Sequence, residues 1–162
     1  MAFKDFFESM LDIDKPETIY PGEVVDLRLR KKVSEKQAYD GVPTNYYDIL
    51  LHGTDTKVGV IDLRLKMNEV MYYYGHVGYN ITKKYRGHNY SYFACKILFG
   101  IAKKEYDMDE LFITCNPDNV ASYKTLLKLK GELVEVCPVP EDHEMYRLGD
   151  RFKCVFRYKI KI

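Results

Sequence analysis

The residues best suited to chemistry lie in a short basic segment, 83–89, between an expected strand and a long expected helix. The first N–H groups of a helix have no intrahelical partner and carry the positive end of its dipole, so they favour phosphate oxygens. Gly87 permits close approach of the backbone to a ligand. Positive charge comes from Lys83, Lys84, Arg86 and His88. The segment predicts a pyrophosphate-binding loop; the alternative is a basic loop that only caps a helix.

A second polar group follows about thirty residues later, again where a strand runs into a helix. The run Asn116-Pro117-Asp118 follows an apolar strand, and Asp118 is a candidate cap for a helix over 119–128. Asn119 and Ser122 lie in the first turn of that helix. Two successive strand-to-helix junctions therefore carry the polar residues.

The hydrophobic pattern predicts the elements that hold these junctions. Apolar spacing indicates a short helix over 3–11, and alternation or β-branched and aromatic content indicates four strands, which we expect to form an antiparallel meander, over 24–30, 46–51, 58–66 and 71–81. The rest of the chain is expected to alternate, with helices over 90–106 and 119–128 and strands over 111–115, 133–136 and 152–160. The order β-β-β-β-α-β-α-β-β predicts an α+β fold, with a mixed, strongly twisted sheet of about seven strands flanked by helices.

Length and composition restrict the function. The 162 residues suit one domain over 1–162, and the 46% hydrophobic and 30% charged content excludes a disordered chain. A net charge of +1 argues against nucleic acid as the partner, although the many tyrosines leave base stacking as a weak alternative. No signal-peptide pattern or long apolar run occurs, so we expect no membrane association and a cytoplasmic protein. The spacing of the four cysteines argues against a metal site and for reduced, mostly buried thiols.

With its two junctions, the sequence resembles the GNAT superfamily of acetyl-CoA-dependent N-acetyltransferases. The loop of that family reads Arg or Gln, two residues, Gly, one residue, then Gly or Ala, and the matching run here is 86–91. Asn89 stands where the family usually has Gly, and Ser91 where it has Gly or Ala; Asn tolerates a left-handed backbone and Ser is small. Gly78-Tyr79 and the Asn119, Ser122 pair look most like the branch of ribosomal-protein N-terminal acetyltransferases.

The resemblance implies acetyl-CoA as co-substrate and a set of residues that hold it. The backbone of Tyr79, Asn80 and Ile81 would pair with the pantetheine arm like an added strand. Asn119 would hydrogen-bond the pantetheine, and Ser122 would lie near the thioester sulfur. The pyrophosphate would be held by Arg86, Gly87, His88, Asn89, Tyr90, Ser91 and Tyr92.

Three residues are candidates for the catalytic groups. The positions of the usual family base and acid are Thr114 and Leu126 here, so neither group is present. The ribosomal branch suggests Ser122 as proton donor to the leaving thiolate, the alternative being a helix Ser bonded to a carbonyl. Tyr123 is a second candidate acid. His76, next to the strand expected to line the acceptor site, is a candidate base, although a lone His is more often structural.

We therefore expect an N-acetyltransferase that moves an acetyl group directly from acetyl-CoA to a primary amine in a ternary complex. The amine is either a protein N-terminus or a small molecule. The alternative is an acyl-CoA-binding module without transferase activity. The region 31–45, which usually helps to wall the acceptor site, looks shortened. The tyrosines 72–74 and Phe3, Phe6 and Phe7 could line an acceptor groove, the alternative being strand packing and helix docking. The acidic run 141–144 could attract a cationic substrate, the alternative being a solvated loop. An exposed edge strand at 152–160 could pair two chains in a homodimer.

Overall fold

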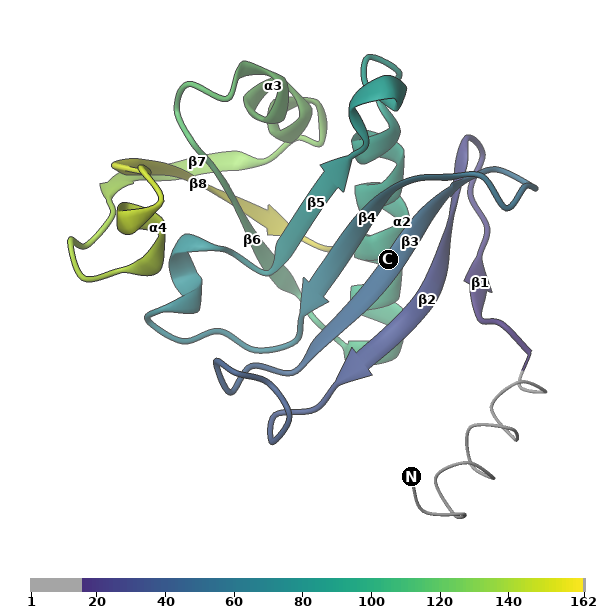
Figure 1. The fold of residues 1–162 in the computed structure, drawn as a ribbon, viewed down its shortest axis with the longest axis horizontal. Coiled ribbons are helices and arrows are strands. Elements are labelled where there is room, and N and C mark those ends of the chain that lie inside the picture. Colours follow the sequence, from purple (N-terminus) through teal and green to yellow (C-terminus); the bar gives the residue numbers. More distant parts are fainter. Residues whose placement is uncertain (1–15, 162) are drawn as a thin grey trace.

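The computed structural model describes residues 16–161, which form two antiparallel sheets and the helices that cover them (Figure 1). The first sheet contains β1 (Ile19–Tyr20), β2 (Val25–Val33), β3 (Thr44–Leu51), β4 (Lys57–Arg64) and β5 (Val77–Ile81), in that order. The second contains β6 (Glu110–Cys115), β7 (Glu132–Pro138) and β8 (Phe152–Lys159), in the order β6-β8-β7. The helices are α2 (Tyr90–Tyr106), α3 (Val120–Lys128) and α4 (Glu144–Arg147).

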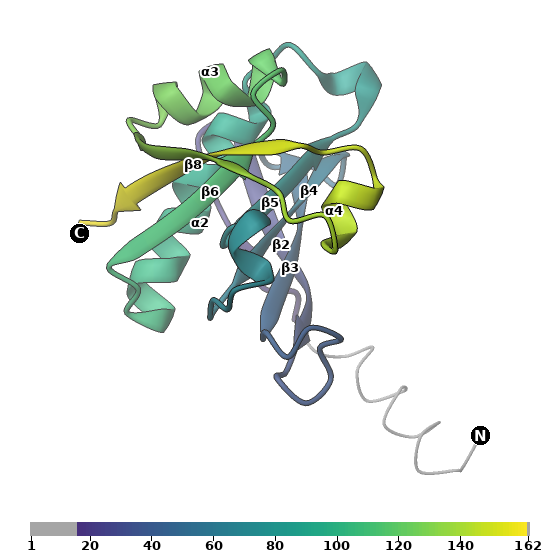
Figure 2. The same cartoon turned by 90° about the vertical axis from the view of Figure 1, so that its left-hand side faces the viewer.

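The core lies between α2 and one face of the first sheet (Figure 2). Alternate residues of the strands point at the helix, and Leu27, Ile49 and Ile61 are fully or almost fully buried there. The facing side of α2 is made of small and apolar residues, all of them buried: Ala94, Cys95, Leu98, Ile101 and Ala102. The alternation read from the sequence is therefore the pattern of a sheet covered by a helix on one face.

The opposite face of the first sheet is charged. Asp48 of β3 is buried beneath three cations, with Arg28 at 3.1 Å, Lys57 at 2.9 Å and Arg30 at 3.7 Å. Burial would raise the pKa of Asp48, but the hydrogen bonds and charges of Lys57 and Arg28 hold it below its usual value. The region 34–43 between β2 and β3 contains turns and no helix, in agreement with the shortening expected from the sequence.

The two sheets are joined where β5 and β6 begin to separate. Gly75 and Ile113 form an isolated bridge, and the backbone N–H of His76 donates to the carbonyl of Phe112 at 2.7 Å. Beyond this point β5 ends the first sheet and β6 pairs with β8 (Figure 1). The expected single mixed sheet is therefore two antiparallel sheets that share one junction.

The expected strand over 71–81 is wrong in its first half. Met71–Tyr73 forms one turn of 3-10 helix, which begins after Asn68, whose side chain accepts from the N–H of Met71 at 2.8 Å. Gly75 then has a φ of +72° and reverses the chain into β5. The tyrosines have high strand propensity, but the hydrogen bond from Met71 to the Asn68 side chain and the left-handed backbone of Gly75 favour a turn instead.

The idea that 152–160 is an exposed edge strand is also wrong, because β8 lies between β6 and β7. The loop 138–150 contains the short helix α4, which His143 caps by accepting from the N–H of Met145 at 3.1 Å. All four cysteines are free, and three of them are buried. Among residues 16–161 no helix is long and apolar enough to cross a membrane. The helix expected over 3–11 lies outside the described residues.

Replacement of Gly75 tests the junction between the sheets. A Cβ on Gly75 would lie 2.7 Å from the carbonyl oxygen of Phe112, and its φ of +72° disfavours any other residue. We expect Gly75→Ala to lower the free energy of unfolding by about 3 kcal/mol or more. Gly53→Ala is the matched control, since its φ is +69° with nothing within 4 Å, and it should cost about 1–2 kcal/mol. Equal losses in urea unfolding would show that the close contact is unimportant.

Candidate active site

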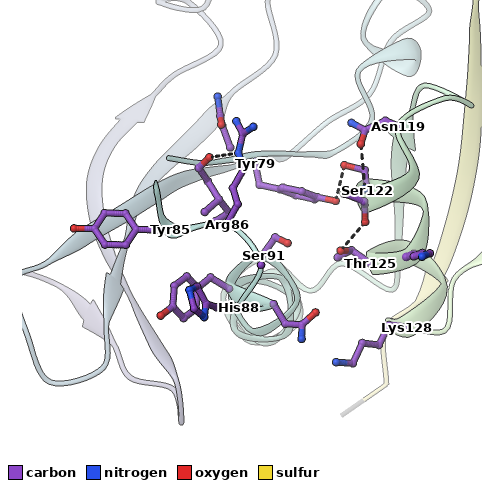
Figure 3. Close-up of a pocket in the computed structure, with 16 residues that line it drawn as sticks. Tyr79, Tyr85, Arg86, His88, Ser91, Asn119, Ser122, Thr125 and Lys128 are labelled. Atoms are coloured by element: carbon purple, nitrogen blue, oxygen red, sulfur yellow. Dashed lines mark hydrogen bonds between the residues drawn. The ribbon is translucent and has the colours of Figure 1, made fainter. Parts of the chain in front are cut away.

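A cavity of about 480 Å³ lies where β5 ends, between the start of α2 and the start of α3 (Figure 3). The structure brings nearly all of the predicted cofactor residues around this one cavity. They are Tyr79, Asn80 and Ile81 from β5; Arg86, Gly87, His88, Asn89, Tyr90 and Ser91 from the loop and α2; and Asn119 and Ser122 from the start of α3. Tyr92 does not line it and instead contacts Lys96 and Lys128 with its ring.

The basic loop reaches the cavity through an unusual entry into α2. Gly87 has a φ of +88° and Asn89 a φ of +59°, so both residues adopt left-handed backbone. Asn89 therefore takes the conformation expected of a glycine at this position. No side chain caps the start of α2 at Asn89, which leaves the first N–H groups of the helix available to an anion. The Arg86 side chain donates to the carbonyl of Ile81 at 2.9 Å, which fixes it across the loop.

The wall contributed by α3 is built on Asn119. Its side-chain oxygen accepts from the N–H of Ser122 at 3.2 Å, so Asn119 is the N-cap of α3, a role expected for Asp118. Further residues that line the cavity were not predicted from the sequence. They are Ala121, Lys124, Thr125 and Lys128 of α3 and Tyr85 of the loop. The four residues of α3 follow Asn119 and Ser122 at helical spacing, so the periodicity of a helix could have identified them. The two lysines add positive charge opposite Arg86.

Two hydroxyl groups meet at the inner end of the cavity. The phenol of Tyr79 donates to Oγ of Ser122 at 3.3 Å (Figure 3). Burial raises the pKa of Tyr79 to about 12, so the phenol is protonated at neutral pH. Tyr123, one residue further along α3, does not line the cavity and packs edge-on against Phe156, with ring centroids 5.3 Å apart. Of the two candidate acids on α3, only Ser122 therefore faces the cavity.

His76 is held at the junction of the sheets rather than in the cavity. Its Nδ1 accepts from the N–H of Phe112 at 2.9 Å and its ring stacks on that of Phe112. Burial, assisted by the charge of Arg64, lowers the pKa of His76 to about 4. An imidazole that already accepts at Nδ1 and is buried as the neutral form has the properties of a structural group. This geometry favours the structural alternative for His76.

The two positions that hold the usual family base and acid are also structural here. The Thr114 hydroxyl donates to the carbonyl of Tyr73 at 2.8 Å, which ties β6 to the 3-10 turn. Leu126 is fully buried on the inner side of α3. The Thr114 hydroxyl is thus engaged by a backbone carbonyl, and the Leu126 side chain has no proton to donate or accept.

Carboxylates lie on the side of the first sheet away from α2. Asp62 of β4 alternates with the inward-facing Ile61, and burial raises the pKa of its carboxyl group against the opposing charge of Arg64, 3.3 Å away. Its Oδ1 is buried without a hydrogen bond among the residues described. The expected acceptor features meet nearby: Tyr74 donates to Glu144 of α4 at 2.8 Å and Tyr72 donates to Glu135 of β7. The tyrosines thus join the 3-10 turn to the acidic part of the chain.

Comparison with known proteins agrees with this arrangement. A family model described as an acetyltransferase (GNAT) domain matches residues 10–132. A search of curated proteins by sequence found no significant match.

Solved structures similar to this chain include several ribosomal-protein acetyltransferases. The ribosomal L7/L12 alpha-N-protein acetyltransferase RimL without ligand matches with a TM-score of 0.66 and 14% identity, over 90% of this chain and 96% of that one. RimL in complex with coenzyme A gives 0.65 and 14%, over 88% and 98%. A putative ribosomal-protein-serine acetyltransferase from Vibrio cholerae gives 0.63 and 16%, over 90% and 99%.

At 14% to 16% identity the structural likeness shows the fold, whereas the family model is a match to the amino-acid sequence. The family model spans most of the chain, including the basic loop, α2 and the capped start of α3, which surround the cavity. The family model therefore shows that the chain belongs to the GNAT family of acetyltransferase domains.

Proposed function

We propose that this protein transfers an acetyl group from acetyl-CoA to a primary amine, by direct attack of the amine on the thioester in a ternary complex. The observation that carries the proposal is that one cavity is lined by the end of β5, the uncapped start of α2 and the face of α3 that holds Asn119 and Ser122. A nucleotide-linked thioester needs a phosphate site at one end and polar groups near the sulfur at the other. The cavity has both.

The phosphate end is the basic loop. We infer that the pyrophosphate binds the free N–H groups at residues 87–91, with charge supplied by Arg86, Lys124 and Lys128. The pantetheine arm then runs along β5. Because β5 is the last strand of its sheet, the backbone groups of its outer edge are open to pair with an extended ligand. Asn119 is suited to hydrogen-bond the arm through its side-chain NH₂ group, since its oxygen is used as the helix cap.

The reaction requires modest chemistry from the protein. The neutral amine attacks the thioester carbon, the new C–N bond forms, the C–S bond breaks, and its electron pair stays on sulfur. The proton lost by the amine balances the proton gained by the thiolate. We propose that Ser122 donates to that sulfur, because it is the hydroxyl of α3 that lines the cavity and does not donate to a carbonyl of its own helix. Positioning of amine and thioester supplies much of the remaining rate.

The position proposed for the cofactor indicates where the acceptor amine binds. With the cofactor filling the α2 and α3 side of β5, the amine approaches from the other side of the sheet, where Asp62, Tyr74 and Glu144 lie. That surface suits a cationic amine, either a small molecule or a protein N-terminus. RimL is described as acting on the α-amine of a ribosomal protein, which favours testing peptide N-termini first.

The alternative is an acyl-CoA-binding module without turnover. Its support is specific: Thr114 and Leu126 occupy the positions of the usual base and acid, and both have structural partners. Cofactor binding without product formation from peptide, polyamine and aminoglycoside acceptors would favour this alternative.

Charge reversal in the loop tests the phosphate site. We expect Arg86→Glu to weaken acetyl-CoA binding about tenfold or more, because a cation beside the phosphates becomes an anion. Lys36→Glu, on the turn between β2 and β3, makes the same change in net charge away from the cavity and should leave the affinity unchanged. Isothermal titration of both variants gives the dissociation constants. An Arg86→Glu protein with wild-type affinity would remove the pyrophosphate from this loop.

Removal of the Ser122 hydroxyl tests the proton donor. Ser122→Ala should lower kcat about a hundredfold, the lower end of the range for a general acid, and change KM for acetyl-CoA much less. Ser34→Ala, on an exposed turn, serves as control. Steady-state kinetics with any acceptor that the wild type uses separates the two constants. A proportionate loss in cofactor affinity would instead mark Ser122 as a binding residue.

His76 makes a separate prediction for pH. Its pKa in the folded state is about 4 against 6.5 in the unfolded chain, so the unfolded chain binds more protons between these values. Stability contributed by the neutral imidazole is therefore present above pH 6.5 and decreases as the pH falls toward 4. We expect His76→Gln to reduce this loss in urea unfolding and to leave the acidic limb of the pH–rate profile in place. Loss of that limb would identify His76 as the base.

A further inference from the structure

We propose that Tyr79 is a positioning residue that holds the Ser122 hydroxyl with its hydrogen directed at the sulfur of the bound cofactor. The inference rests on the proposed function, because it requires a thiol at the Ser122 end of the cavity. It assigns to the Tyr79 side chain a task separate from the backbone pairing expected of β5.

The geometry joins two elements that are distant in the sequence. Tyr79 comes from β5 and Ser122 from the first turn of α3, and both line the cavity. Their hydroxyl oxygens are 3.3 Å apart (Figure 3). Among residues 16–161, this is the sole hydrogen bond made by either hydroxyl. The hydrogen bond therefore links β5, along which the pantetheine arm is proposed to lie, to the first turn of α3 across the cavity.

Ser122 departs from what a helical hydroxyl ordinarily does, and the same helix supplies the comparison. Thr125 donates its hydroxyl to the carbonyl of Ala121, four residues earlier, at 3.1 Å. The equivalent carbonyl for Ser122 belongs to Asp118, and it accepts instead from the N–H of Val120 at 3.0 Å. The Ser122 side chain is thus turned away from its own helix and toward Tyr79, which is not the local bonding expected of a structural helix serine.

The buried phenol fixes the direction of the bond. The ring of Tyr79 packs against the core between α2 and the first sheet, on the strand position opposite Ile61. A pKa of about 12 keeps its hydrogen in place at neutral pH, and Oγ of Ser122 is its acceptor. A serine hydroxyl has one hydrogen and two lone pairs. With a lone pair occupied by Tyr79, the Ser122 hydrogen is free for an acceptor that enters the cavity, and the thiolate formed on C–S cleavage is that acceptor.

The thiol of bound CoA reports this arrangement without need of an acceptor amine. A hydrogen bond donated to the thiolate stabilises the charged form and lowers the pKa of the thiol. Ultraviolet absorbance of the thiolate, followed against pH with saturating CoA, measures that pKa directly. We expect Tyr79→Phe and Ser122→Ala each to raise it by about one unit, a tenfold change in the equilibrium. The double variant should show no further rise, because both changes remove the same interaction.

The matched control is Tyr47→Phe. Tyr47 is a buried tyrosine of β3 whose hydroxyl accepts from Asn45 at 3.4 Å and which does not line the cavity. This variant loses the same oxygen from the same core and should leave the thiol pKa unchanged. Melting midpoints of all variants without ligand confirm that each is folded.

The outcomes separate this inference from the proposed function. A thiol pKa unaltered by Tyr79→Phe overturns the inference while the proposed function stands, provided that CoA binds. Strictly additive effects of the two variants overturn it as well, since the hydroxyls would then act independently. A wild-type protein that does not bind CoA removes the proposed function itself, and the inference with it.

Discussion

The junction between β5 and β6 is the constraint on which the site depends. The strands are joined at the bridge between Gly75 and Ile113, and the stacked rings of His76 and Phe112 close the same point. Since β6 then pairs with β8, β5 keeps one edge without a strand partner. An exposed edge in the middle of a folded domain is normally a liability. Here the start of α3 lies opposite the free edge of β5, so the edge faces the cavity between α2 and α3.

The single long helix α2 links this opening to stability. Its buried face closes the core of the first sheet, and its first turn supplies the free N–H groups of the proposed phosphate site. The left-handed backbone at Gly87 and Asn89 sets the direction in which those groups point. Packing along α2 therefore fixes the geometry at its end, and the loop needs few contacts of its own to stay in place.

The sequence predicted the parts of the structure that depend on local spacing. The alternation around Leu27, the helical face of α2 and the polar residues at both strand-to-helix junctions are all periodic patterns, and the structure has them. It failed where one residue outweighs a pattern, as at Gly75, which converts half of an aromatic strand into a turn. The position of β8 between β6 and β7 depends on pairing between distant segments, which no local pattern records. The Tyr79–Ser122 contact was missed for the same reason.

The central position of β8 has a consequence for how the chain acquires its structure during synthesis. In the second sheet β6 and β7 do not pair with each other, and each is hydrogen-bonded through β8. Since β8 follows both β6 and β7 in the chain, these two strands are synthesised before the strand with which they pair. The first sheet and α2 have all of their residues by Tyr106 and can pack earlier. The α3 wall of the cavity is anchored by the hydrogen bond from Tyr158 of β8 to the carbonyl of Leu126, so this contact can form only after β8 has been synthesised.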